Sequence, residues 1–350
     1  MLETTLDRAA PTRFPGGVFA SPSPVLPRIT VLGGGNGLAV LLQGLREARF
    51  PDPVRDASDL ERLTAIVTVA DDGGSSGVLR REFNILAPGD IRNCLLALSD
   101  ADPTLQDLFN FRFDGKAGGH SLGNLMLTAL ALLERDFGKA VERAAKLLAV
   151  RGRVLPATLD DVQLLAEFAD GSRCMGESGI TAARRRIRRV SLVPPGTRAL
   201  PQALSAISGS DLVVIGPGSL YTSLIPVVLV RGIAHSIAES GARVALVMNL
   251  MTEPGETDGY SAGDVLAALR KHAPDLPIHD VLLNSEQLPD GQMQRYAAEG
   301  ATPIVTDLLS ITRQGCRAVE RDLLSAGPKV RHSPHKLARA LLDLVAKDTP

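Results

Sequence analysis

Three glycine-rich segments of the sequence could bind an anionic ligand. They span residues 33–37, 73–77 and 216–218, and each follows a short apolar run. Glycine permits close backbone approach, and consecutive N–H groups beside a helix N-terminus attract phosphate. The first segment matches the GxGxxG pattern of dinucleotide sites only in part, because no glycine follows at Ala39 or Val40. These segments predict phosphate-binding loops, with tight strand-to-helix turns as the alternative.

Two adjacent acids, Asp71 and Asp72, come between the second apolar run and its glycines. An acid at this position of a dinucleotide-binding fold accepts hydrogen bonds from a ribose. A carboxylate pair could also hold Mg²⁺ together with substrate phosphates. The alternative is a turn or N-cap for the glycines that follow. Ser75 could donate to a phosphate or cap the next segment.

Further polar residues stand where helices begin or strands end. Arg92 and Asn93 open a helix behind Asp90, and Arg92 could pair with a phosphate or with the acid pair. Asn124 follows near the start of the next helix and could face the same pocket. Asn249 ends an apolar run, which suits readout of a base or sugar, although its side chain could equally stabilise its own loop.

The apolar periodicity predicts the elements that must position these residues. We expect strands at residues 29–32, 63–70, 186–193, 211–215, 243–249, 281–283 and 304–305, and helices at 38–49, 88–98, 121–150 with one break near 136–138, and 334–346. Apolar strands that alternate with helices indicate an α/β protein with a parallel sheet that helices cover on both faces. Parallel strands share one carboxyl edge, so the glycine segments should meet there.

The same pattern predicts one domain with a leader. Residues 1–27 are rich in Pro, Gly and Ser and are expected to form a flexible leader. A single domain should span 28–346, with 101–195 as an inserted, mainly helical and irregular section. The arginine run at 184–189 is expected to be a solvated strand face, with an anion or partner contact as the alternative.

Composition excludes several classes of function. The 350 residues carry 38 Lys+Arg against 39 Asp+Glu, so no global basic field favours nucleic acid. Three dispersed cysteines indicate a reducing cytoplasm, since they form no disulfide framework. No apolar stretch approaches the roughly 18 residues of a membrane span. No lysine lies in any glycine segment, which argues against a P-loop ATPase.

Six motifs in order resemble one family. They are VLGGGNG, VADDGGSSG, PGDIRNCL, GHSLGNL, GPGSLYTS and NLMTEPGET, and the likeness covers about residues 28–346. Together they resemble the YvcK or gluconeogenesis-factor family of the CofD-like superfamily. This resemblance implies a three-layer α/β/α Rossmann-like fold with a mostly parallel sheet. The resemblance further implies a cytoplasmic regulatory protein that binds a UDP-sugar, UDP-N-acetylglucosamine, and links gluconeogenic growth to cell shape and peptidoglycan synthesis. It also implies cell-wall or regulatory protein partners and allows a homodimer through the apolar helices.

The resemblance also implies binding residues. The expected ligand contacts are Gly34, Gly35, Asn36, Gly37, Asp72, Gly73, Gly74, Ser75, Arg92, Asn93, Asn124, Gly216, Gly218, Ser219, Asn249, Tyr296 and Arg331. Of these, Tyr296 could stack on uracil or on the sugar, and Arg331 could pair with the diphosphate. Asn36 stands where threonine is common in the family, which alters that phosphate contact. The resemblance identifies no catalytic residue and leaves open whether the chain is an enzyme.

Two other readings of the sequence remain open. One is a CofD-like transferase that moves a phospholactyl or phosphoenolpyruvyl group onto a deazaflavin alcohol, with Mg²⁺ on Asp71 and Asp72. The other, more distant, is an NAD(P) oxidoreductase, which the imperfect glycine fingerprint disfavours. Binding of UDP-sugar without catalysis fits the last two motifs better than either.

Overall fold

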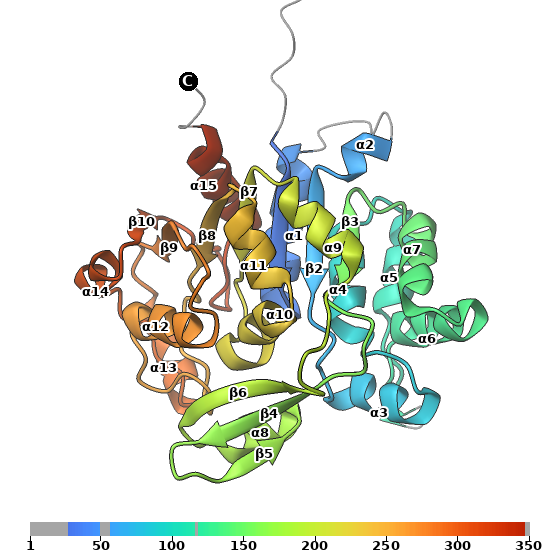
Figure 1. Cartoon of the computed structure of the whole chain (residues 1–350), viewed down its shortest axis with the longest axis horizontal. Helices are drawn as coiled ribbons and strands as arrows, with labels where there is room; N and C mark the ends of the chain where they lie inside the picture. The colour runs from blue at the N-terminus through green and yellow to red at the C-terminus, as the bar shows by residue number, and fades with distance from the viewer. Residues whose placement is uncertain (1–26, 50–56, 116–117, 347–350) are drawn as a thin grey trace, which may run out of the picture.

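A computed structural model describes residues 27–49, 57–115 and 118–346. Its centre is a parallel seven-stranded sheet of order β10-β9-β8-β7-β1-β2-β3 (Figure 1). The strands are β1 (Ile29–Gly33), β2 (Leu63–Val67), β3 (Arg153–Pro156), β7 (Leu212–Ile215), β8 (Arg243–Val247), β9 (Asp280–Asn284) and β10 (Arg317–Arg321). All residues of β1, β2 and β7 are buried, because helices cover both faces.

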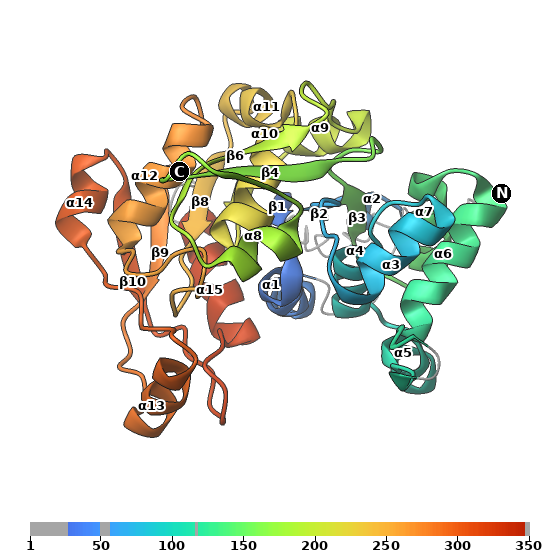
Figure 2. The same ribbon diagram turned by 90° about the horizontal axis from the view of Figure 1, so that it is seen from below.

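The helices form the two outer layers of the predicted three-layer fold. Figure 2 shows α1 and α15 on one face of the sheet and α9 and α11 on the other. The helices are α1 (Gly35–Arg49), α2 (Ala57–Leu60), α3 (Gly74–Phe83), α4 (Gly89–Ala97), α5 (Pro103–Asn110), α6 (Leu122–Glu134), α7 (Phe137–Leu147), α8 (Glu177–Ala183), α9 (Pro201–Ser208), α10 (Ile225–Leu229), α11 (Ile233–Glu239), α12 (Ala262–His272), α13 (Asp290–Ala298), α14 (Leu308–Arg313) and α15 (Pro334–Ala346). The fold class predicted from sequence is confirmed.

The strand order places a binding crevice. From the central β1, the chain first runs outward through β2 and β3, and later returns to β7 on the other side and continues to β10. The connections from β1 and β7 therefore leave in opposite directions at the carboxyl edge. Ligands of open α/β sheets bind at such a switch point.

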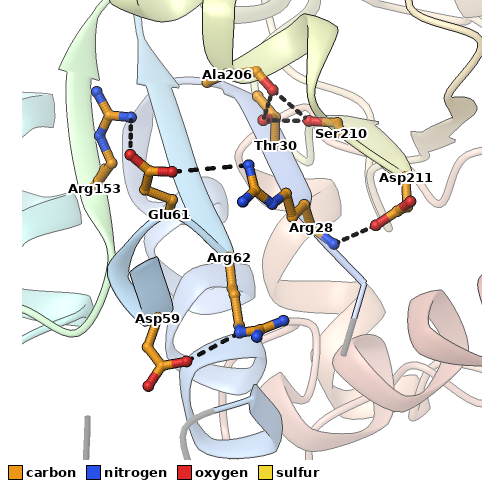
Figure 3. Close-up of polar contacts among 9 residues, drawn as sticks. All are labelled: Arg28, Thr30, Asp59, Glu61, Arg62, Arg153, Ala206, Ser210 and Asp211. Carbon is orange, nitrogen blue, oxygen red and sulfur yellow. Dashed lines mark hydrogen bonds and ion pairs between the residues drawn. The ribbon is translucent and has the colours of Figure 1, made fainter. Parts of the chain in front are cut away.

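The opposite edge of the sheet is tied by polar contacts (Figure 3). The backbone N–H of Arg28, just before β1, donates to Asp211 Oδ2, just before β7, over 2.6 Å. Glu61 lies 3.8 Å from the guanidinium groups of both Arg28 and Arg153, across β1, β2 and β3. Exposed ion pairs contribute about 0–1 kcal/mol each, so the buried apolar strands supply most of the stability here.

A small antiparallel sheet projects beyond the carboxyl edge of the main sheet (Figure 1). Its order is β5-β4-β6, from β4 (Gln163–Phe168), β5 (Arg173–Met175) and β6 (Ile187–Val193), and α8 packs beside it. We call residues 163–193 the arm. The arginine run at 184–189 lies on its exposed side, where Arg185 pairs with Asp170 and Arg188 pairs with Glu167. This placement agrees with a solvated strand face.

The structure differs from the expected elements at several places, of which three bear on the sheet. The section 101–195 is not wholly an insertion, because its strand β3 forms the edge of the main sheet beside β2. Residues 304–305 form no strand; Val305 takes part only in an isolated bridge with Ser261. The edge strand β10 was not predicted, because its alternating charged residues give no apolar run. The leader predicted over 1–27 lies outside the described residues except for residue 27.

No helix in the described ranges is both long enough and apolar enough to cross a membrane.

Candidate functional site

The first glycine loop joins β1 directly to α1. Gly35 has φ of +68°, a conformation that favours glycine. A Cβ on Gly34 would lie 2.5 Å from Asp90 Oδ2 and 2.7 Å from Thr68 Cγ2, so only glycine fits there. The chain therefore turns tightly at the end of β1 and presents the first turn of α1 to the crevice.

The glycine loop at residues 216–218 follows β7 and contacts the first loop. It is called the second glycine loop below, because the segment at 73–77 does not line the cavity. A Cβ on Gly218 would lie 3.2 Å from the carbonyl oxygen of Gly34. Asn249, just past β8, clamps this loop: its Oδ1 accepts from the Gly218 N–H over 3.1 Å, and its Nδ2 donates to the Gly218 carbonyl over 2.9 Å. The Asn249 side chain thus positions the second glycine loop. A structural role of this kind was the alternative to readout of a base or sugar.

A cavity of about 1020 Å³ opens over both loops. Ten of the expected ligand contacts line it: Gly34, Gly35, Asn36, Gly37, Asn93, Gly218, Ser219, Asn249, Tyr296 and Arg331. They come from the ends of β1, β7 and β8, from α4 and α13, and from the segment before α15. The fold therefore gathers segments up to about 300 residues apart at one crevice, as the parallel-sheet argument requires.

Seven expected contacts do not line this cavity: Asp72, Gly73, Gly74, Ser75, Arg92, Asn124 and Gly216. Gly216 begins the glycine loop after β7, and an added Cβ there would lie 3.1 Å from the Val247 carbonyl oxygen. The others belong to a neighbouring group beneath the arm. In that group the Ser75 hydroxyl lies 2.8 Å from His120 Nδ1 and accepts from Asn124 Nδ2 over 3.1 Å.

Two hydrogen bonds connect this neighbouring group to the cavity. Arg92 Nη2 donates to Asn93 Oδ1 over 2.7 Å, and Asn93 Nδ2 donates to Asn36 Oδ1 over 3.4 Å. Arg92 is buried, and its guanidinium lies beside Asp90 and Arg112. Arg92 thus does not line the cavity itself but holds the side chain of Asn93, which does.

Four carboxyl groups form an acidic group where the arm meets the main sheet: Asp71, Asp72, Asp90 and Glu177. Burial raises the pKa of Asp90 to about 6, and a hydrogen bond from the Gly35 N–H opposes the rise. Burial raises the pKa of Glu177 to about 9, and the neighbouring carboxylates add to the rise. Glu177 is therefore protonated at neutral pH.

The carboxyl groups of the acidic group make few of the contacts that a metal site of their own would need. Asp71 Oδ1 accepts from the Gly73 N–H over 2.7 Å, and Asp72 Oδ1 accepts from the Ser178 N–H over 2.9 Å. Across the described residues, no three His, Cys, Asp or Glu side chains are grouped to hold a metal ion. Asp71 and Asp72 could thus hold Mg²⁺ only with further ligands from substrate phosphates and water.

Replacement of Glu177 by glutamine should raise the melting temperature at pH 8 by about 5 °C. Between about pH 4.5 and 9 the folded chain holds a proton on Glu177 that the unfolded chain releases, so stability falls as pH rises through this window. Glutamine removes this dependence. Thermal melts at pH 8 and pH 4.5 check the expectation, and the difference should vanish at pH 4.5.

The matched control is Glu239→Gln, on the exposed side of α11, which should change neither melt. An equal gain for Glu177→Gln at both pH values would contradict burial of a protonated carboxyl.

The cavity-lining residues that sequence reasoning missed include two buried titratable residues, Glu253 and His332. In the same loop after β8, Glu256 accepts hydrogen bonds from the Tyr221 N–H over 3.2 Å and from the Thr222 hydroxyl over 2.9 Å. Glu256 thereby holds the segment after the second glycine loop. The motif that contains Glu253, and the position of His332 beside Arg331, were the available signals.

Comparison with known proteins identifies the family. The family model for 2-phospho-L-lactate transferase CofD matches residues 29–324. The gluconeogenesis factor of Bacillus subtilis is 44% identical over 322 residues, which cover 91% of this chain and 98% of that protein. The gluconeogenesis factor of Halalkalibacterium halodurans is 43% identical over 318 residues, with 90% and 95% covered. The chain belongs to the gluconeogenesis factors of the CofD family.

A solved structure shows the same fold for a family member. A crystal structure of a Bacillus halodurans protein superposes with a TM-score of 0.85 at 42% identity, and the match covers 90% of this chain and 99% of that chain. The family resemblance drawn from the six sequence motifs is therefore confirmed across nearly the whole fold.

Proposed function

We propose that this gluconeogenesis-factor relative is a regulatory protein that binds UDP-N-acetylglucosamine in the cavity over β1 and β7. One observation carries the proposal: two glycine loops, in contact at Gly34 and Gly218, face the same cavity as Tyr296 and Arg331. Backbone N–H groups at the start of α1 suit the diphosphate, and the guanidinium of Arg331 supplies an opposite charge. The volume of about 1020 Å³ suffices for a nucleotide-sugar.

The biological role follows from the relatives. Several are named gluconeogenesis factors, which supports a role of this chain in growth on gluconeogenic carbon sources. A UDP-sugar used for the cell wall would make the cavity a sensor of precursor supply. On this proposal the bound state acts in the cytoplasm on cell-wall or regulatory protein partners, and so influences cell shape and peptidoglycan synthesis.

UDP-N-acetylglucosamine at a hundredfold excess over its dissociation constant should raise the melting temperature by about 5 °C, since a ligand stabilises the state that binds it. Arg331→Ala should cut this shift to less than half, because the diphosphate loses a cation. The control Arg339→Ala, exposed on α15 near the same end of the chain, should keep the full shift. No shift of the parent chain at millimolar ligand would contradict the proposal.

A second function has its own observations. The matching family model carries the name of a phospholactate transferase, and the acidic group lies beside the cavity. Bound to Asp71, Asp72 and substrate phosphates, Mg²⁺ would neutralise charge on the leaving phosphate. Incubation with nucleotide-linked phospholactate or its phosphoenolpyruvate equivalent, deazaflavin alcohol and Mg²⁺ tests this function. Product formation would establish it, and folded protein without turnover would remove it.

A further inference from the structure

The arm is basic, although the chain as a whole is not. Residues 163–193 contain six arginines and three acidic residues, a net charge of +3, whereas the formal charge of the whole chain is -1. One of the three acids, Glu177, lies in the acidic group where the arm meets the main sheet, so it adds no negative charge to the arm's outer surface. The six arginines are Arg173, Arg184, Arg185, Arg186, Arg188 and Arg189. A surface with this excess of one charge attracts a partner of the opposite charge.

One face of the arm's sheet is open. Along β4, buried residues alternate with more exposed ones, so the strand has a buried side and an outer side. In Figure 1, α8 lies behind the strands, and the other face is turned toward the viewer with none of the described helices in front of it. We call this open side the outer face. It carries the side chains of Leu165, Glu167, Arg173, Met175, Arg189 and Ser191.

Cross-strand pairing concentrates arginine at one end of the outer face. Arg173 of β5 and Arg189 of β6 both lie opposite Glu167 of β4. The Glu167 carboxylate lies 3.8 Å from the guanidinium of Arg173 and 3.0 Å from that of Arg188. The guanidinium of Arg189 makes no hydrogen bond or ion pair among the described residues. One carboxylate thus stands among three guanidinium groups, and positive charge is left over.

A small apolar patch lies beside these arginines. Met175 is 47% exposed and lies opposite the half-buried Leu165. Methionine and arginine are both enriched in protein–protein interfaces. Single-stranded nucleic acid, in contrast, stacks its bases on exposed aromatic rings, and the one aromatic residue of the arm, Phe168, is buried. The outer face therefore suits a protein surface better than a nucleic acid.

The arm is also held in place before any partner binds. The Ser178 N–H donates to Asp72 Oδ1 over 2.9 Å, which ties the arm to the loop after β2. The Val190 N–H donates to His272 Nε2 over 3.0 Å, which ties β6 to α12. A surface that is already ordered loses little conformational freedom on association, so binding costs less free energy.

We propose that the outer face of the arm is a docking surface for an acidic segment of a partner protein that carries apolar side chains between its carboxylates. The carboxylates pair with Arg173 and Arg189, and the apolar side chains pack on Met175. A second copy of the outer face does not fit, because the arginines of both copies would face each other. The inference needs no ligand in the cavity, so it goes beyond the proposed function and can fail without it.

Two acidic peptides of ten residues probe this surface on the full chain. Each has four glutamates on either side of a central pair, which is Leu-Leu in one peptide and Ser-Ser in the other. In fluorescence-anisotropy titrations at low salt, the Leu-Leu peptide should bind at least about threefold more tightly, because it also contacts Met175. The double variant Arg173→Gln, Arg189→Gln should bind both peptides about tenfold more weakly. Met175→Gln should bind the two peptides equally.

The matched control removes the same charge elsewhere. The double variant Arg313→Gln, Arg339→Gln changes exposed arginines of α14 and α15, and it should bind both peptides within about twofold of the parent chain. An equal loss of affinity in the two double variants would overturn the inference, since net charge alone would then explain binding. So would a poly(U) RNA of about 20 nucleotides that binds more tightly than either peptide, or a parent chain that binds neither peptide at millimolar concentration.

Discussion

Replacement of Gly37 by alanine should weaken the binding of UDP-N-acetylglucosamine by about tenfold or more. A Cβ on Gly37 would lie 2.8 Å from the carbonyl oxygen of Pro217 and 3.1 Å from its carbonyl carbon. Both are backbone atoms of the second glycine loop, so they cannot rotate away as a side chain would. The loop must move by several tenths of an ångström, and a binding site loses affinity when its donors are displaced by about 0.5 Å.

Titration calorimetry on folded protein measures this effect. The matched control is Gly291→Ala on α13, where an added Cβ meets nothing within 4 Å, and this variant should bind like the parent chain. Undiminished affinity in Gly37→Ala would show that contact between the two loops does not shape the site.

Replacement of Gly44 by alanine should lower the free energy of unfolding by about 2 kcal/mol. Gly44 lies in α1, where alanine favours the helix by about 1 kcal/mol. Its Cβ, however, would lie 2.0 Å from the carbonyl oxygen of Pro334 and 2.5 Å from the carbonyl carbon, at the start of α15. Overpacking of this kind costs about 1–3 kcal/mol, and such a short contact with backbone places it at the upper end.

Chemical denaturation of the two glycine variants decides which effect prevails at Gly44. Gly291→Ala has the helical gain without the contact, so it should be stabilised by up to about 1 kcal/mol. If Gly44→Ala were stabilised by the same amount, α1 and α15 would not be packed as closely as the structure shows.

The central elements of the fold could be predicted because their sequence signals are local. The buried strand β1 is a short aliphatic run that ends in glycines, and α15 matches the amphipathic stretch at 334–346. The edge strand β10 gives no such signal, because its exposed position permits charged residues. The bridges at residues 303 and 305 depend on partners about 50 residues away, which local periodicity does not reveal.

The candidate site could be predicted in part, because its glycine loops follow strands whose sequence signals are local. Glycine loops at strand ends had to meet at one edge, and the family resemblance added Tyr296 and Arg331 from the C-terminal part of the chain. Which of the other polar residues share the cavity depends on how the arm and α3 pack. Asp72 is drawn away from the cavity by the Ser178 N–H of the arm, a contact over 106 positions that no motif encodes. Buried polar atoms without a hydrogen-bond partner, such as His332 Nε2, are evident only from three-dimensional packing.

The central claim is that a nucleotide-sugar places its diphosphate over the two glycine loops. A crystal structure of the chain grown with UDP-N-acetylglucosamine tests it most directly. We expect both phosphates within hydrogen-bonding distance of the backbone N–H groups of Gly34, Asn36, Gly37 or Ser219, with Arg331 beside them. Ligand density at the acidic group beneath the arm, with the cavity over β1 and β7 left empty, would contradict the account.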